Sequence, residues 1–125
     1  MTGEDHKAVV RRLINDVWNS GNLALLDELY ERRLAEQAKA WIAPFRNSFS
    51  DLEMEIVDLV AEQDTVAARF LCSGTHTGKW LGHPPTGRRF HRVAEVYFFQ
   101  FAEGRIIKAW GLEDTYGRLR QLGLT

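Results

Sequence analysis

The sequence predicts an α+β fold in which three N-terminal helices pack on one face of a curved, mostly antiparallel sheet. The first observation is a change of hydrophobic period, from about 3.6 before Ser50 to about 2 after it. The second is the order of the patterns, since a βαβ fold would place helices between the strands. The third is a pair of apolar runs, Val93 to Phe101 and Ile106 to Leu112, joined by a short turn with Gly104. A sheet curved around helices leaves a cavity, where we expect the functional site.

Apolar residues at helical spacing mark the three helices. The first is expected from about Gly3 to Asn19, with a capping box between Thr2 and Asp5. Gly21 stops it, and a second apolar stripe follows. A third pattern runs from Ala38 to Phe49, in which Pro44 is expected to kink or restart the helix.

Alternating apolar and polar residues after Ser50 predict four to six strands. Those with clear patterns are Leu52 to Leu59, Thr65 to Gly74, Arg89 to Phe101 and Arg105 to Leu112. The stretch from Gly74 to Gly87 has the glycine and proline content of an irregular loop. A last short helix is expected from Thr115 to Gln121.

Length and composition indicate one domain, residues 1–125, of 14.4 kDa. The formal net charge of -1 gives no field that would attract nucleic acid or an anionic membrane. Cys72, the single cysteine, lies in an apolar strand pattern and is expected to be a buried, unreactive thiol. The N-terminal sequence has no apolar signal region, and no run approaches the roughly 18 apolar residues of a membrane span. We therefore expect a cytoplasmic protein.

Three stretches resemble a known family: FRNSFSDLEMEI at Phe45 to Ile56, GTHTGKWLGHPPTGRR at Gly74 to Arg89, and EGRIIKAWGLEDTYGRLRQLG at Glu103 to Gly123. In this order they resemble the SnoaL-like polyketide cyclases, also called ester cyclases, of the nuclear-transport-factor-like superfamily. The resemblance implies a single SnoaL-like domain with the fold of a cone-shaped α+β barrel. It covers roughly the C-terminal two thirds of the chain.

The resemblance further implies a cofactor-free enzyme that closes a ring by intramolecular aldol condensation on a polyketide ester. Asp114 matches the acid/base aspartate of the family's W-x-x-x-D ending. The chain departs from the family pattern at Lys108, where a glutamate is common, at Tyr97, where a histidine is frequent, and in the short segment Leu34 to Lys39. Family members usually form dimers, and apolar residues on both faces of Val93 to Phe101 also predict a homodimer through the outer sheet face.

Asp114 stands where the strand pattern stops, so its carboxyl is expected at the end of an apolar sheet face. An apolar surround that includes Trp110 and Leu112 would desolvate the carboxylate and raise its pKa toward the range useful for proton transfer. The alternative role for Asp114 is to cap the helix that starts at Thr115, and the two roles are compatible. His76 is a possible assistant that would orient Asp114 or bind a substrate carbonyl, and the alternative is a loop histidine bonded to backbone.

The other candidate residues form a predicted substrate-binding wall for a small apolar or polyketide-like molecule. His91, Glu95, Tyr97 and Phe99 have the same parity along one strand, so they are predicted to share a face, either toward the cavity or away from it. The aromatic residues Trp41 and Trp110 complete the predicted wall. The histidines lack the spacing of metal ligands, so no metal site is expected.

Two other functions remain open on the same fold. One is an epoxide hydrolase or a ketosteroid-isomerase-like enzyme, because an acid in an apolar pocket can also activate water or shuttle a proton. An Asp-Arg-Asp set would favour hydrolysis, with Arg69 and Asp114 as the nearest candidates and no evident second acid. The other is a non-catalytic module for binding or dimerisation. The sequence has no GxSxG elbow, P-loop or dinucleotide-binding motif.

Overall fold

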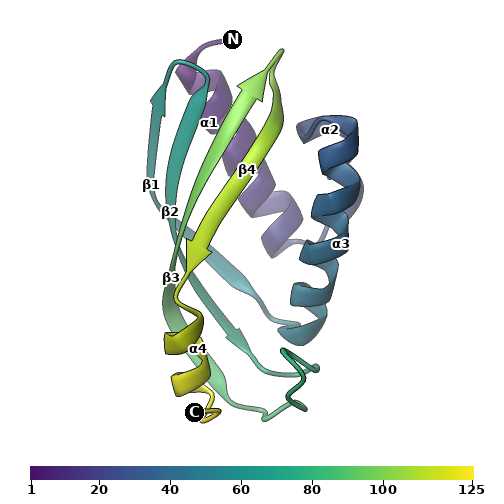
Figure 1. Cartoon of the computed structure of the whole chain (residues 1–125), viewed down its shortest axis with the longest axis vertical. Helices are drawn as coiled ribbons and strands as arrows, with labels where there is room; N and C mark the ends of the chain where they lie inside the picture. The colour runs from purple at the N-terminus through teal and green to yellow at the C-terminus, as the bar shows by residue number, and fades with distance from the viewer.

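The sheet is an antiparallel meander of four strands, seen in Figure 1 as long, strongly twisted arrows. The computed structural model describes all residues, 1–125. The strands are β1 (Glu53–Glu62), β2 (Thr65–Thr75), β3 (Arg89–Ala102) and β4 (Arg105–Glu113). These bounds confirm the predicted strands to within three residues at every end, and with the preceding helices they confirm the α+β class.

The helices form a layer against the sheet, and one further helix follows the last strand. They are α1 (Gly3–Arg12), the π-helix η1 (Leu13–Asn19), the 3-10 turn η2 (Leu23–Leu25), α2 (Leu26–Leu29), α3 (Arg32–Ser48) and α4 (Thr115–Gln121). Helix α1 packs on β1 and β2, whereas α3 approaches β4. Figure 1 shows the N-terminus at one end of the long axis and α4 with the C-terminus at the other. None of the helices combines the length and apolar character that crossing a bilayer requires.

Local signals explain the helix ends. Thr2 and Asp5 make the predicted capping box, and Gly21 follows η1 with a φ of 79°. The helix does not restart at Pro44, because α3 continues through it from Arg32 to Ser48. Proline removes a hydrogen bond to the carbonyl four residues earlier, here that of Ala40. Ala40 is exposed, so water can satisfy that carbonyl while the buried side of α3 holds the helix in place.

A β-bulge in β3 decides which of its side chains face the helices. Between the pairs Cys72↔Val93 and Gly74↔Phe90 the strand contains one extra residue, and Arg92 has a φ of 53°. Phe90 and Val93 are therefore both buried although their parity differs.

A second β-bulge decides which side chains of β4 face the helices. Phe101 pairs with Ile106 and Gln100 pairs with Lys108, so Ile107 is the extra residue. Beyond it the inward positions are opposite Phe99, Tyr97 and Glu95 on β3, and they are occupied by Ala109, Gly111 and Glu113. Trp110 therefore points outward and stacks on Phe98 of β3.

Candidate active site

Asp114 lies at the corner between β4 and α4. Its backbone N–H donates to the carbonyl of Ala94 at 3.0 Å, and its Oδ1 accepts the N–H of Gly117 at 2.8 Å, so it caps α4. Its side chain is exposed, and Trp110 and Leu112 before it face outward with exposed fractions of 53% and 71%. The predicted apolar surround of this carboxyl is therefore wrong, because the bulge at Ile107 turns both residues to the outer face.

The carboxylate of Asp114 rests against Gly117, one turn into α4. A Cβ at Gly117 would overlap Oδ2 of Asp114 and come within 3.0 Å of Oδ1. Only Oδ1 of the carboxylate accepts a hydrogen bond, and Oδ2 has no hydrogen-bond donor. The cap thus fixes the direction of the carboxyl group without using both oxygens.

Below this corner, two carboxyl groups share one buried guanidinium. Arg118 of α4 is 0% exposed and Glu95 of β3 is 1% exposed. Nη2 of Arg118 donates to Oε2 of Glu95 at 2.8 Å, and Nη1 donates to Oε1 of Glu113 at 2.9 Å. The sequence analysis missed Arg118 and Glu113. The sequence signal for Arg118 was its spacing, because a residue four positions before the apolar Leu122 lies on the same face of a helix. The structure buries both residues.

Aromatic rings enclose the guanidinium of Arg118. Its Cζ lies 5.0 Å from the ring centroid of Phe45, 5.7 Å from that of Trp80 and 4.8 Å from that of Phe90. These rings come from α3, from the loop between β2 and β3, and from β3. Cation–π contacts at such distances stabilise a desolvated cation. Arg118 of α4 therefore contacts α3, β3 and the loop between β2 and β3.

Burial changes the ionisation of the groups in this interior. It raises the pKa of Glu95 to about 7; the negative charge of Glu113 acts in the same direction, and the Arg118 cation opposes both. Burial also raises the pKa of Tyr97 and of the Cys72 thiol, and the charge of Glu95 adds to both shifts. The burial of Cys72 confirms the sequence prediction for it.

His76 is locked into the loop that follows β2. Its Nδ1 accepts the N–H of Thr86 at 3.2 Å, and its backbone pairs with Arg88 and Gly87. In the neutral ring the proton is then on Nε2, which is buried without a partner. The ring lies 6.5 Å from Trp80, so His76 shares an aromatic neighbour with Arg118, but no contact joins it to Asp114.

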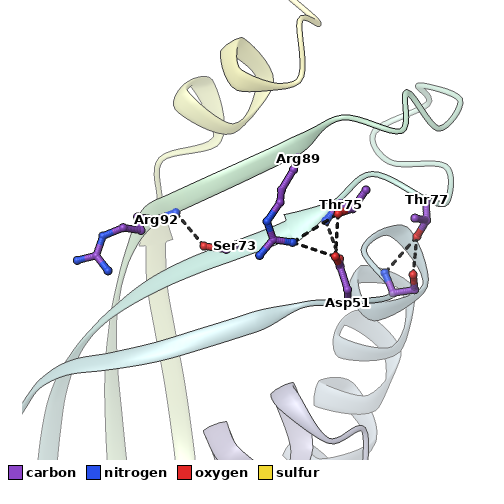
Figure 2. A network of polar contacts seen from close by, with 7 residues as sticks. Asp51, Ser73, Thr75, Thr77, Arg89 and Arg92 are labelled. Atoms are coloured by element: carbon purple, nitrogen blue, oxygen red, sulfur yellow. Dashed lines mark hydrogen bonds and ion pairs between the residues drawn. The ribbon is translucent and has the colours of Figure 1, made fainter.

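Polar contacts in Figure 2 fix the base of this loop against the end of α3. Oδ1 of Asp51 accepts the N–H of Thr75 at 2.6 Å, and Oδ2 accepts an N–H of Arg89 at 2.9 Å. Burial of the Asp51 carboxyl raises its pKa, but the bonds from Thr75 and the Arg89 charge outweigh this and hold the pKa below its usual range. Thr77 bonds to both the backbone and the hydroxyl of Ser50. Hydrogen bonds therefore anchor both ends of the loop that carries His76 and Trp80, at Thr75 and Thr77 before it and at Arg89 after it.

The structure brings together some of the predicted wall and separates the rest. Glu95, Tyr97 and Phe99 face the interior, where the rings of Tyr97 and Phe99 stack at 5.9 Å. His91 does not join them, because the bulge at Arg92 interrupts the alternation.

Both tryptophans of the predicted wall lie elsewhere. Trp110 is on the outer face, and Trp41 of α3 is 42% exposed and leans on Trp18. No group of three or more His, Cys, Asp or Glu side chains is arranged to hold a metal ion.

Comparisons of the sequence and of the fold with known proteins both find polyketide cyclases or their structural relatives. Residues 8–122 match the family model of the SnoaL-like polyketide cyclases. Nogalonic acid methyl ester cyclase of Streptomyces nogalater is 33% identical over 88 residues, which are 70% of this chain but only 63% of that protein. TsrD from Streptomyces laurentii is 27% identical with a TM-score of 0.92, over 100% of this chain and 99% of that one. IdmH from Streptomyces antibioticus is 26% identical with a TM-score of 0.81, over 94% and 98% of the two chains. The family match, which spans nearly the whole domain and includes the interior cluster and Asp114, shows that this chain belongs to the SnoaL-like polyketide cyclase family.

Proposed function

We propose that this protein is a cofactor-free cyclase that closes a ring in a polyketide ester by intramolecular aldol condensation, with Asp114 as an acid/base residue. The substrate class follows from the similarity to nogalonic acid methyl ester cyclase. The role of Asp114 follows from its position in the W-x-x-x-D ending, Trp110 to Asp114.

One observation carries the proposal: a carboxylate with a free oxygen stands at the corner directly above a buried set of ionisable groups. Asp114 is bonded through its backbone to Ala94, the residue before Glu95, and Glu95 and Glu113 are paired across the strands. Aldol closure requires removal of a proton from carbon and delivery of a proton to oxygen, and both are tasks of carboxyl groups. In this proposal, the aromatic side chains that surround Arg118 would form the apolar wall for such a substrate.

Hydrolysis is the second candidate function, and the sequence analysis named Arg69 as a candidate for it. Arg69 is paired with Asp58 on the surface and does not take part in a water-activating set. Glu95, Arg118 and Glu113 instead form an acid–arginine–acid set inside the molecule. Such a set could orient a water molecule against an epoxide, the alternative that the sequence left open.

Product analysis separates the two reactions. Purified protein is incubated with nogalonic acid methyl ester, and in parallel with styrene oxide, and the products are analysed by mass spectrometry. The proposed aldol closure forms a C–C bond and a hydroxyl without loss of water, so its product has unchanged mass and a new ring, whereas hydrolysis adds one water. We expect an isomer from the ester and no diol from the epoxide. Diol formation without cyclisation of the ester would contradict the proposal and favour the hydrolase.

A further inference from the structure

We propose that Glu95 is a second catalytic acid, which donates a proton to the substrate carbonyl oxygen as the ring closes, and that Arg118 is its positioning residue. This assignment rests on the proposed cyclase function. It deepens that function by dividing proton removal and proton delivery between two carboxyl groups.

The balance of charge in the interior is the first argument. Arg118 contacts both Glu95 and Glu113, and its guanidinium carries a single positive charge. The guanidinium is shared between two carboxyl groups, so it compensates an ionised Glu95 only in part in a site of low dielectric. The Glu113 side chain is 32% exposed and can be solvated, whereas that of Glu95 is 1% exposed. The proton therefore belongs on Glu95.

Unbonded polar atoms are the second argument. Nε–H and Nη2–H lie on one edge of a guanidinium, and a carboxylate can accept from both. Here only Nη2 of Arg118 bonds to Glu95 with good geometry, and neither Oε1 of Glu95 nor Nε of Arg118 has such a partner, although the Cys72 thiol and the Tyr97 hydroxyl act on Glu95 as hydrogen-bonding neighbours. Buried polar atoms without partners are uncommon and call for a ligand or an ordered water. A protonated Oε1 would be a donor without an acceptor, and the Nε–H of Arg118 is a second one.

The other groups that face Glu95 act in both directions, and burial together with Glu113 outweighs the groups that favour the carboxylate. Glu113 approaches from β4 and disfavours a second negative charge, whereas Arg118 from α4 favours it. Cys72 from β2 and Tyr97 from β3 itself have raised pKa values and stay neutral near pH 7. From α3 and the loop come only the aromatic rings of Phe45 and Trp80 around Arg118.

The reaction balances without a further reactant. The Asp114 carboxylate takes a proton from the carbon beside one carbonyl, and the resulting enolate carbon forms the new C–C bond with the second carbonyl carbon. The π electrons of that carbonyl move to its oxygen, which takes the proton of Glu95. Transfer of the proton from Asp114 to Glu95 through solvent restores both groups. Because the Glu95 side chain is 1% exposed, the site must open before a substrate oxygen can reach it.

A titration that needs no substrate is the first test. Glutamate carboxyl carbons are labelled with ¹³C, and the Glu95 resonance is assigned as the one missing from Glu95→Gln. We expect that resonance in the wild-type protein to titrate with a midpoint near 7. A midpoint in the range of an exposed glutamate would overturn the assignment.

Kinetics on nogalonic acid methyl ester is the second test, with the exposed Glu62→Gln as the matched control. We expect Glu95→Gln to lower kcat by roughly a hundredfold or more with little change of KM, and to remove the loss of activity as pH rises through about 7. Glu62→Gln should behave as wild type. Should Glu95→Gln fail to fold, Glu95→Asp keeps a carboxyl with a shorter reach and should fold with reduced kcat.

The outcomes distinguish the two proposals. If the wild-type protein cyclises the ester and Glu95→Gln does so at the same rate and with the same pH profile, the assignment of Glu95 fails and the cyclase function stands. If the wild-type protein does not cyclise the ester, the proposed function fails and the role of Glu95 fails with it, whatever the titration shows.

Discussion

At the scale of single residues, the environment of each carboxyl group determines its chemistry. Asp114 and Glu95 were both predicted site residues; the expected apolar surround of Asp114 is wrong, and of the two faces left open for Glu95 the structure has the interior one. The exposed Asp114 caps a helix, and the buried Glu95 has the raised pKa that the sequence analysis had assigned to Asp114. Arg118, which organises the interior, was missed because a charged side chain at an inward helix position is rare unless it is paired.

Glu95 should make the stability of the protein depend on pH. Its folded pKa of about 7 lies above its ordinary value of 4.5. The folded state therefore binds more protons between these values, and the contribution of Glu95 to stability is present below about pH 4.5 and lost as pH rises through about 7. The pKa of Glu95 shifts by about 2.5 units, so at about 1.4 kcal/mol per unit the loss is at most about 3 to 4 kcal/mol.

Urea unfolding between pH 4.5 and 8 measures this effect. The free energy of unfolding of the wild-type protein should fall relative to that of Glu95→Gln as pH rises. Parallel curves for the two proteins would show that Glu95 does not titrate abnormally.

At the scale of elements, the sequence predicts where strands and helices lie better than which way their residues face. The strand bounds, the turn at Gly104 and the helix Thr115 to Gln121 were all predicted correctly, because period and turn residues are local signals. The bulges at Arg92 and Ile107 were not predictable from alternation, since each adds one residue opposite a neighbouring strand. The orientation errors on the strands, for His91, Trp110 and the surround of Asp114, each follow from one of these bulges, whereas the exposure of Trp41 on α3 does not.

Helix α4 offers a test of the corner that holds Asp114. Replacing glycine by alanine inside a helix normally stabilises it by about 1 kcal/mol. At Gly117 the new Cβ would instead overlap the Asp114 carboxylate and displace it from its cap.

We therefore expect Gly117→Ala to lower the melting temperature by several degrees, the effect of losing an N-cap worth about 1 kcal/mol, and to lower cyclase activity. Calorimetry and the ester assay measure both effects. A gain in stability would show that the cap geometry is wrong.

At the scale of the whole molecule, the outer face of the sheet remains uncovered. Exposed apolar side chains gather there from β3 and β4, among them Val96, Phe98, Trp110 and Leu112. Phe98 and Trp110 also line a hollow of about 220 Å³ with Thr65, Gln100 and Lys108. A contiguous apolar face of this kind is typical of an interface.

We expect a homodimer through this face at micromolar concentration, measured by sedimentation equilibrium. Trp110→Glu should give a folded monomer, because a charge would be buried at the interface. The control is Leu81→Glu, which places the same charge at an exposed apolar position in the loop between β2 and β3 and should leave the dimer intact. A wild-type monomer, or a dimer that survives Trp110→Glu, would contradict the prediction.

The central claim is that Asp114 transfers protons in a cyclase, and turnover of nogalonic acid methyl ester by Asp114→Asn tests it most directly. Asparagine keeps the shape of the side chain and its oxygen can still accept the N–H of Gly117, so the melting temperature should stay within a few degrees. Turnover should fall by roughly a hundredfold or more, the scale of a lost general acid/base. Wild-type turnover by the folded variant would contradict the claim, and lost turnover together with a large drop in melting temperature would assign Asp114 to the helix cap alone.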